Sequence, residues 1–298
     1  MKALAITMVC IIFAEVEQHV IRQYLVEEEP PRPKHRLSYR GHSLRYKKKI
    51  ARRIAAWSPQ NRSNVWELSG HYEGDIIVPN FARNGVINES EKWPHGIIPY
   101  YIKNSFTEEQ KDKILKAMDV FNKHTCVQFR PYKKYDRDFI VIQSNDPGCY
   151  SYVGRLDKGQ VVNFHEKCLL HGTLMHEFLH VLGFYHQHSA TERDHYIKIN
   201  WENIKEGRES QFTKVKSTSF GEPYDYKSVM HYSPFAFSKN MRRTIEPLEK
   251  GAQIGQREGI SKIDLNKVIK MYGCKKSRKN RFRRRKYVYR NSEHWKRI

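Results

Sequence analysis

The spacing of apolar residues predicts three short strands in the first two thirds of the chain. Residues 97–102 and 139–143 are nearly continuous apolar runs bounded by polar residues, as buried strands are. Residues 159–164 are expected to form a strand at the edge of a sheet. Beyond Gly183 the pattern is mostly irregular, so the regular elements are expected to crowd into the part of the chain before this glycine.

Helical periodicity predicts three helices. Residues 107–124 form an amphipathic pattern that opens with Thr-Glu-Glu-Gln, a sequence suited to cap a helix. A second helix is expected over 171–182, and a third over 261–272, ended by Gly273. Together with the predicted strands, these helices favour an α+β fold.

The first residues of the chain predict secretion. Residues 1–14 contain Lys2 and then an apolar run that is too short to span a membrane but suits a signal peptide. No other stretch is long and apolar enough to anchor the protein, so no membrane span is expected. The product is therefore expected to be soluble and extracellular.

The net charge of +22 is concentrated at the end of the chain. Residues 275–298 hold 12 basic residues and one acidic residue, whereas residues 84–274 hold 28 basic and 23 acidic residues. The tail is predicted to be disordered, and it could hold the protein on polyanionic glycans of the heparan type or on an acidic matrix. Nucleic acid is not an expected partner, because the predicted signal peptide directs the chain away from it.

The segment from His176 to His186 reads His-Glu-Phe-Leu-His-Val-Leu-Gly-Phe-Tyr-His, which suits a catalytic zinc ion. On a helix, His176 and His180 lie about one turn apart and can reach one ion. Gly183 can adopt a positive φ and turn the chain so that His186 approaches the same ion. Glu177 can accept a proton from a water without being a ligand. Three nitrogen ligands leave zinc the open position that catalysis needs.

The pattern His-Glu-x-x-His-x-x-Gly-x-x-His resembles the zinc signature of the metzincin clan. Residues 228–232, Ser-Val-Met-His-Tyr, resemble the Met-turn of one metzincin family, the astacins, which are secreted zinc metalloendopeptidases. Residues 93–100 and 148–155 also resemble astacin segments, the first of them the opening strand of the mature enzyme. The resemblance covers residues 84–274, the expected catalytic domain.

The resemblance implies a two-lobed fold with a zinc cleft between a sheet-and-helix N-terminal lobe and a largely irregular C-terminal lobe. It implies one Zn²⁺ per subunit and protein or peptide substrates. Met230 would lie beneath the metal. Tyr232 would be a fifth zinc ligand in the free enzyme and would swing away to stabilise the transition state, while Glu177 acts as general base.

Cysteine usage agrees with an extracellular protein. Cys10 would leave with the signal peptide, and the four remaining cysteines form an even set that allows three pairings. A second metal site is not expected, since no Cys-x-x-Cys pair occurs. The astacin resemblance implies the nested pairing, Cys126 with Cys274 and Cys149 with Cys168.

Residues 15–83 differ in character from the rest and are expected to be a weakly folded prosegment. Near its end, Tyr-Glu-Gly-Asp at 72–75 resembles the astacin aspartate switch, which implies that Asp75 occupies the open zinc position in the zymogen. Cleavage after Arg83 would then free Asn84 as the new N-terminus.

Some residues depart from the astacin pattern. Gln187 stands where the family usually has a glutamate that pairs with the new N-terminus, and an amide cannot form that ion pair. Ala190 and Glu192 also replace common family residues, although no zinc ligand is affected. Two sequons, at Asn61 and Asn88, permit glycosylation.

The sequence leaves two other kinds of protein open. The chain could be a secreted polyanion-binding protein on an inactive protease scaffold, or a structural protein stabilised by zinc. Arg242 and Arg243 follow the Met-turn and could favour acidic substrate side chains. Residues 281–284, Arg-Phe-Arg-Arg, resemble a convertase site, at which the tail could be removed.

Overall fold

The structure, a computed structural model, describes residues 29–35, 44–78 and 89–275. The predicted signal peptide, the cleavage point at Arg83 and the sequon at Asn88 lie outside the described residues. So does the tail beyond residue 275, with its predicted convertase site. None of the helices in the described part of the chain has the length and apolar character needed to cross a bilayer.

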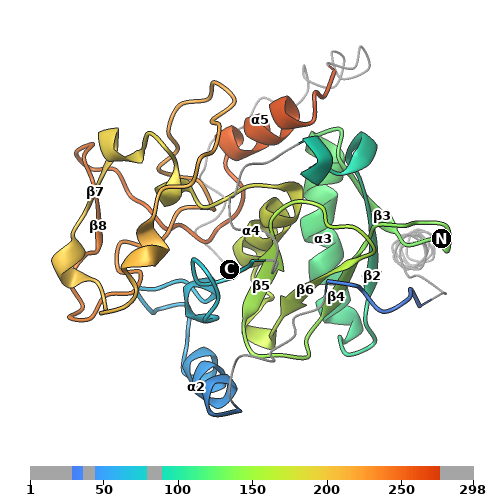
Figure 1. The fold of residues 1–298 in the computed structure, drawn as a ribbon, viewed down its shortest axis with the longest axis horizontal. Helices are drawn as coiled ribbons and strands as arrows, with labels where there is room; N and C mark the ends of the chain where they lie inside the picture. Colours follow the sequence, from blue (N-terminus) through green and yellow to red (C-terminus); the bar gives the residue numbers. More distant parts are fainter. Residues whose placement is uncertain (1–28, 36–43, 79–88, 276–298) are drawn as a thin grey trace, which may run out of the picture.

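A six-stranded sheet forms the first lobe (Figure 1). In spatial order its strands are β1 (Ile76–Ile77), β5 (Cys149–Tyr152), β6 (Gln160–Phe164), β4 (Ile140–Gln143), β2 (Ile97–Ile102) and β3 (Gln128–Pro131). Strands β6, β4, β2 and β3 run parallel, whereas β5 is antiparallel to β6, and β1 runs parallel to β5. The strands predicted at 97–102 and 139–143 are confirmed as β2 and β4.

The strand predicted at 159–164 exists, but its expected place at a sheet edge is wrong. β6 pairs with β4 on one side and with β5 on the other, and all five of its residues are buried. Its polar side chains are satisfied locally. The Gln160 amide donates to the Gly154 carbonyl, and the Asn163 amide donates to the Gly148 carbonyl, both at 2.8 Å. Polar residues can therefore lie in an interior strand.

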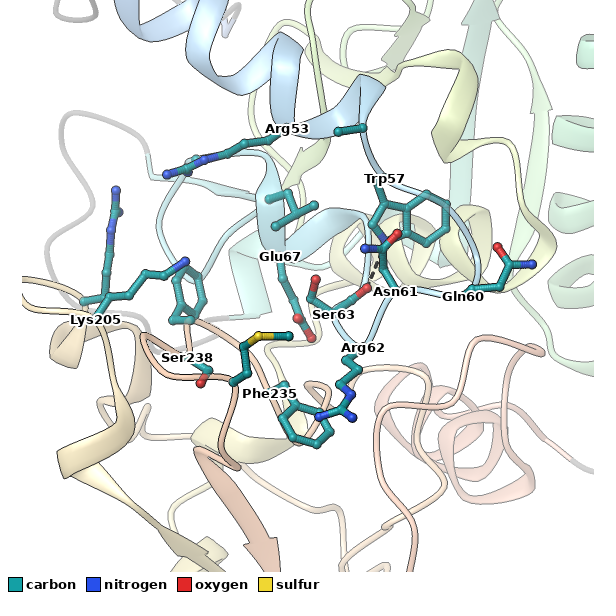
Figure 2. Close-up of a pocket in the computed structure, with 16 residues that line it drawn as sticks. Arg53, Trp57, Gln60, Asn61, Arg62, Ser63, Glu67, Lys205, Phe235 and Ser238 are labelled. Carbon is teal, nitrogen blue, oxygen red and sulfur yellow. Dashed lines mark hydrogen bonds between the residues drawn. The ribbon is translucent and has the colours of Figure 1, made fainter.

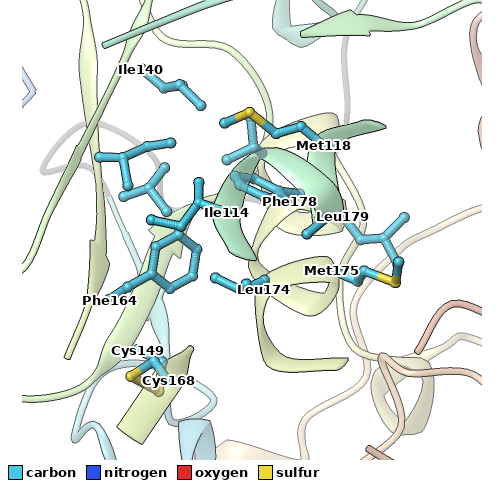
Figure 3. Packing of buried hydrophobic residues seen from close by; sticks show 14 of the residues in the cluster. Ile114, Met118, Ile140, Cys149, Phe164, Cys168, Leu174, Met175, Phe178 and Leu179 are labelled. Carbon is cyan, nitrogen blue, oxygen red and sulfur yellow. A yellow bond between two sulfur atoms is a disulfide. The ribbon is translucent and has the colours of Figure 1, made fainter. Parts of the chain in front are cut away.

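Two long helices pack on one face of the sheet. They are α3 (Glu108–His124) and α4 (His171–Leu182), and both match their predicted ranges. Thr107 caps α3 through the reciprocal capping box that the sequence predicts. Figure 3 shows Ile114 and Met118 of α3 meeting Leu174 and Phe178 of α4 in the main core. The zinc-motif helix is therefore rigidly seated against the sheet.

The second lobe is largely irregular, as the sequence predicts. It contains a two-stranded sheet of β7 (Ile197–Ile199) and β8 (Ile245–Pro247), and it ends with helix α5 (Lys262–Met271). Short 3-10 turns connect these elements: Gln187–Ser189, Arg193–His195, Trp201–Asn203 and Glu209–Phe212. A separate apolar cluster around Phe212 and Ile245 forms its core. The fold is thus α+β with two lobes.

Two disulfides join distant parts of the fold. Cys126 bonds to Cys274, and Cys149 bonds to Cys168, which is the nested pairing that the astacin resemblance implies. The first connects residues 148 positions apart and ties the end of α5 to the loop before β3. A closed loop of this length restricts the unfolded chain strongly.

The weak folding expected for residues 15–83 is wrong for the described part. Residues 44–78, here called the N-terminal segment, contain α2 (Leu44–Ala55), a 3-10 turn at Trp66–Leu68 and strand β1. Ile50, Ile54 and Trp66 are buried in the same core cluster as the sheet and α4. The basic composition of 15–83 concealed these few apolar residues, which suffice to dock the segment.

Candidate metal centre

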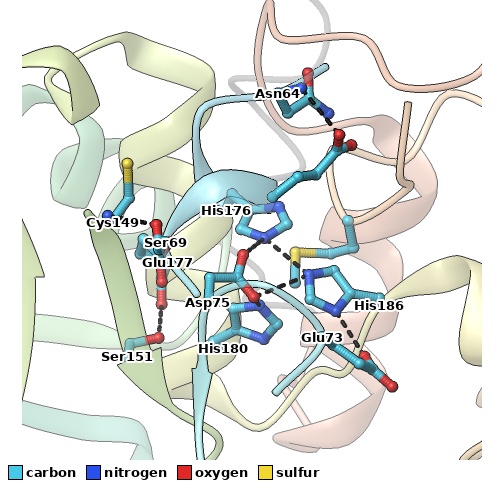
Figure 4. A network of polar contacts seen from close by, with 12 residues as sticks. Asn64, Ser69, Glu73, Asp75, Cys149, Ser151, His176, Glu177, His180 and His186 are labelled. Carbon is cyan, nitrogen blue, oxygen red and sulfur yellow. Dashed lines mark hydrogen bonds and ion pairs between the residues drawn. The ribbon is translucent and has the colours of Figure 1, made fainter. Parts of the chain in front are cut away.

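Helix α4 and the turn after it bring three histidines together, as Figure 4 shows. His176 and His180 lie one turn apart on α4 and are fully buried. The helix ends at Leu182, and Gly183 follows with φ of 110°, a left-handed conformation in which residues with a side chain are strained. This turn returns the chain so that the His186 ring centre lies 4.7 Å from that of His180.

The carboxylate of Asp75 lies among the three imidazole rings. Its oxygens are 2.9 Å from His176 Nε2, 3.6 Å from His180 Nε2 and 3.3 Å from His186 Nε2. The Nε2 atoms of His176 and His186 are only 3.2 Å apart. Three side chains from residues 176–186 and one from residue 75 thus point their ligand atoms at one buried spot.

The other nitrogen of each ring is fixed by an acceptor. Nδ1 of His176 donates to the Val229 carbonyl at 2.8 Å, and Nδ1 of His180 donates to the Phe184 carbonyl at 2.7 Å. Nδ1 of His186 lies 2.7 Å from the Glu73 carboxylate. A proton on Nδ1 leaves the Nε2 lone pair available, and this is how metal-binding histidines are oriented.

The four side chains fit a metal ion. Their ligand atoms all lie within 4.8 Å of one another, and all four residues are buried. His180 Nε2 and Asp75 Oδ1 have no hydrogen-bond partner among the described residues, which is costly for buried polar atoms. Imidazole and carboxylate ligands in a set of four suit zinc. One ion would satisfy the atoms that hydrogen bonds do not.

The charges of the cluster also favour a cation. Burial alone would raise the pKa of Asp75, but His186 and the bonds from the three rings hold it well below its usual value. Burial alone would lower the pKa of His186, but the carboxylates of Asp75 and Glu73 raise it to about 9. The surroundings of His186 thus carry negative charge that a bound cation would balance.

Glu177 is held in an unusual state beside this cluster. It is fully buried, and neither carboxyl oxygen has a hydrogen-bond partner within the described chain. Burial raises its pKa well above the ordinary value, and the charge of Asp75 adds to the effect. A carboxyl poised in this way, next to a metal-ligand set, is typical of a catalytic acid or base.

Tyr232 and Met230 lie close to the histidines. The Tyr232 hydroxyl donates to the backbone carbonyl of Glu73, and its ring centre is 4.8 Å from that of His186. Its ring stacks on His188 at 3.6 Å. The Met230 carbonyl accepts a hydrogen bond from the N–H of Gln187, the residue after His186. The segment that resembles the Met-turn is therefore joined to the histidine motif.

The N-terminal segment reaches the cluster by joining the sheet. Strand β1 pairs with the β5 edge in parallel, with Ile76 opposite Ser151. The Ser151 N–H donates to the Asp75 carbonyl at 3.1 Å, which fixes the backbone at the aspartate. Gly74 has φ of 90°, and a Cβ there would lie 2.9 Å from the Glu67 Cα. Only glycine suits this turn.

Several residues that hold the segment were not predicted from the sequence. Glu73 and Trp66 both contact zinc-motif histidines, since Trp66 stacks on His176 with ring centres 4.2 Å apart. Glu67 accepts hydrogen bonds from the N–H and hydroxyl of Ser233. The only available signal was for Glu73, which lies two residues before Asp75 in the segment that resembles the switch.

Arg257 forms hydrogen bonds to the loop at residues 59–64 of the N-terminal segment. Its guanidinium donates to the backbone carbonyls of Pro59, Asn61 and Ser63 and to the side chain of Asn64. It also lies over the Trp57 ring, 5.7 Å from the centre. No sequence pattern marks this arginine, because its partners are almost 200 positions away.

The remaining residues singled out in the sequence lie apart from the cluster. Gln187 accepts a hydrogen bond of 2.6 Å from the buried ammonium of Lys267. Arg242 and Arg243 are exposed, and the Arg243 guanidinium lies 5.9 Å from the centre of the Phe235 ring. Asn61, in the first sequon, is exposed and accepts from Ser58.

Comparison with known families agrees with this geometry. Residues 85–273 match the family model described as Astacin, a family of peptidases. The chain belongs to the astacin family. Astacins are zinc-dependent, and the His₃Asp cluster could hold one such ion. Asp75 lies outside the matched residues, in the N-terminal segment, whereas the three histidines lie inside.

Individual relatives show the extent of the similarity. Zinc metalloproteinase nas-6 of Caenorhabditis elegans is 36% identical over 250 residues, which cover 78% of this chain and 72% of the relative. Seminal metalloprotease 1 of Drosophila melanogaster is 40% identical over 221 residues, 70% of this chain and 88% of the relative. The chain spans about half the length of other relatives, covering 43% of nas-13 and 55% of nas-7 from C. elegans.

A solved astacin structure shares the fold. High choriolytic enzyme 1, a hatching enzyme zinc-protease from the medaka fish Oryzias latipes, aligns with a TM-score of 0.58 and 32% identity. The alignment covers all of that chain and 67% of this one. The two lobes described above are therefore those of an astacin domain.

The first prediction concerns metal content. We expect the purified chain to bind one zinc ion, and we expect His180→Ala to lose it because one of the three imidazole ligands that hold the ion is removed. Elemental analysis after removal of loosely bound metal measures the ratio. His195→Ala, which changes an exposed histidine outside the cluster, should keep the zinc. Full zinc content in His180→Ala would contradict this assignment.

The second prediction concerns pH. Burial raises the pKa of Glu67 from 4.5 to about 7, so the folded chain holds this proton more tightly than the unfolded chain. The resulting stabilisation is full below the unfolded value and is lost as the pH rises through about 7. Glu67→Gln should therefore flatten the fall in melting temperature between about pH 5 and pH 7.

The matched control for this measurement is Glu258→Gln, an exposed glutamate next to Arg257. Each variant removes one titrating carboxyl and leaves the other groups in place, so a flattened profile in Glu67→Gln but not in Glu258→Gln isolates the Glu67 carboxyl. Parallel pH profiles for the wild-type chain and Glu67→Gln would show that Glu67 does not set the dependence.

Proposed function

We propose that the chain is a secreted zinc endopeptidase, made as a zymogen, that hydrolyses peptide bonds in extracellular proteins. The observation that carries the proposal is the position of Asp75. This carboxylate comes from outside the astacin match and lies among the three imidazole nitrogens of the motif. A residue so placed completes a metal site and closes it.

In this proposal His176, His180 and His186 hold the zinc ion, and Asp75 is the fourth ligand of the latent form. Four protein ligands leave no position for water, whereas three leave the open position of a catalytic site. When bound, zinc supplies a Lewis acid that polarises the scissile carbonyl and lowers the pKa of water toward about 7. Latency therefore ends when Asp75 leaves.

Glu177 is the proposed general base. It would take a proton from the attacking water and pass it to the leaving amine, which moves one proton without a second acid. In the latent form its pKa is held high by burial and by Asp75. Departure of Asp75 would remove the contribution of its charge to the raised pKa. Release of the segment would therefore lower the pKa of Glu177 and make the carboxylate form, which accepts the proton, easier to reach.

Tyr232 is the proposed donor to the oxyanion of the transition state. Its hydroxyl now donates to the Glu73 carbonyl, and that carbonyl departs with the N-terminal segment. The released hydroxyl could then serve the developing negative charge. Met230 and Gly183 keep structural roles, Met230 in the turn joined to Gln187 and Gly183 at the end of α4.

Substrate binding would reuse the contact that the segment makes. Strand β1 adds to the β5 edge by backbone hydrogen bonds, and an extended peptide can pair with the same edge when β1 is absent. Such pairing depends on the backbone and presents the peptide bond next to the cluster. This supports protein and peptide substrates in general without fixing one side chain.

Processing would begin with removal of the signal peptide, residues 1–14. Cleavage after Arg83 would then separate the prosegment, residues 15–83, and leave Asn84 at the start of the catalytic domain, which ends at 274. This is supported by the start of the astacin match at residue 85. Secretion is also supported by the likeness to a hatching enzyme zinc-protease. The basic tail, residues 275–298, would bind polyanionic glycans or matrix.

Glu177→Ala tests the proposed mechanism. The processed variant should keep its zinc and lose roughly 10²- to 10⁴-fold in turnover of casein, the range expected for a lost general base. A chelator should abolish the wild-type activity. Near-normal turnover in Glu177→Ala would remove this residue from its role. A processed wild-type chain that holds zinc without hydrolysing casein would favour the inactive polyanion-binding scaffold.

Asp75→Ala tests the proposed latency. We expect the uncleaved variant to hydrolyse a short peptide that the uncleaved wild-type chain leaves intact, because the fourth metal position is opened. The rate should stay below that of the processed chain, because β1 still occupies the edge of β5. Asp146→Ala is the control, since it breaks the 3.0 Å ion pair between Lys47 of the segment and the sheet without touching the cluster. Equal activity in the two variants would mean that loosening the segment, and not losing the carboxylate, relieves latency.

A further inference from the structure

A cavity of about 570 Å³ lies between the N-terminal segment and the C-terminal lobe (Figure 2). One wall comes from α2 and the loop after it, and the other from the stretches around residues 205 and 237. The metal-ligand cluster does not line it. The cavity therefore exists only while the segment is docked on the lobe.

Four cationic side chains line this cavity, two from each wall. Arg53 and Arg62 belong to the segment, and Lys205 and Arg208 belong to the lobe. None of the four makes an ion pair with a carboxylate in the described part of the chain. Cationic side chains of the N-terminal segment thus face cationic side chains of the C-terminal lobe across the contact between the two.

The one acidic residue among those lining the cavity does not neutralise these cations. Glu67 is buried, and its carboxyl oxygens accept from Ser233 and from the Asn64 N–H. Burial also raises its pKa to about 7, so part of the population is uncharged at neutral pH. The cavity therefore keeps a strongly positive character.

The cations act on one another. The pKa of Lys205 is lowered first by burial and then by the charges of Arg53, Arg208 and Lys49. Two of these three come from the segment, so docking brings like charges together, which is unfavourable. A bound anion that contacts both walls would replace this repulsion with attraction and so stabilise the docked segment.

The arrangement of the cavity indicates the class of anion. Figure 2 shows Arg53 and Lys205 together at one end, while Arg62 lies at Phe235. A linear chain with repeated negative groups can meet both places. The Phe235 ring already carries the Arg62 guanidinium at 4.9 Å and the Arg243 guanidinium at 5.9 Å. The Phe235 ring is therefore not free to stack on a base, and base stacking is what single-stranded nucleic acids depend on.

We propose that this cavity binds a sulfated polysaccharide, which bridges the N-terminal segment and the C-terminal lobe. None of the described residues that line the site belongs to the metal centre. Because it is complete only in the docked form, its ligand stabilises that form by mass action. The sugar would thus hold the N-terminal segment on the C-terminal lobe, independently of whether the metal centre is catalytic.

The test uses the full chain and a heparin octasaccharide. Thermal unfolding and calorimetric titration are measured for the wild-type chain and for K205Q/R208Q. We expect the sugar at a hundredfold excess over Kd to raise the wild-type melting temperature by roughly 5 °C. In K205Q/R208Q we expect this rise to be largely lost and the Kd of the site to weaken about tenfold.

The control variant K134Q/K250Q removes the same charge from exposed lysines that do not line the cavity, and it should behave as wild type. The tail, predicted to be disordered, would bind in folded and unfolded chains alike and would not raise the melting temperature. Binding without a thermal shift, or equal shifts in both variants, would overturn the proposal. An equal shift with a single-stranded oligonucleotide of matched charge would overturn the assignment to a sulfated sugar.

Discussion

The convergence of three imidazole nitrogens and one carboxylate on a buried spot is the constraint on which the rest of the structure depends. Four polar groups removed from water are unfavourable unless each finds a partner. An acceptor at Nδ1 of each ring fixes the orientation of that ring, so each Nε2 atom points toward the same buried spot. The packing of α4 through Phe178, the turn at Gly183 and the pairing of β1 with β5 all serve this convergence.

In the proposed zymogen, the same contacts would connect the catalytic groups with their inhibition. Glu73 and Asp75 lie two residues apart on one turn, and together they contact all three histidines and the Tyr232 hydroxyl. Withdrawal of this single turn would change the ligand set, the surroundings of Glu177 and the partner of Tyr232 at once. The turn at residues 73–75, which requires Gly74, thus contacts or influences the metal ligands, Glu177 and Tyr232, the groups that the proposed reaction would use together.

The sequence predicts the metal helix well and the N-terminal segment poorly, for physical reasons. Helix 171–182, its glycine stop and the strands at 97–102 and 139–143 follow from local periodicity, and the structure confirms them. The buried residues of the segment are sparse within a basic background, and their partners lie far along the chain, so no local pattern reveals them. Arg257 and Glu67 are unpredictable in the same way, as is the interior place of β6, which depends on neighbours on both sides.

The indole rings of Trp57 and Trp66 belong to the segment, yet they are 3% and 0% exposed and share the central core of the astacin domain. A processed molecule would therefore lose part of its own hydrophobic interior along with its inhibitor. In the proposed maturation, the cleaved form would be less stable than the form that keeps the segment, and the intrinsic fluorescence of the two tryptophans would report the loss of the segment.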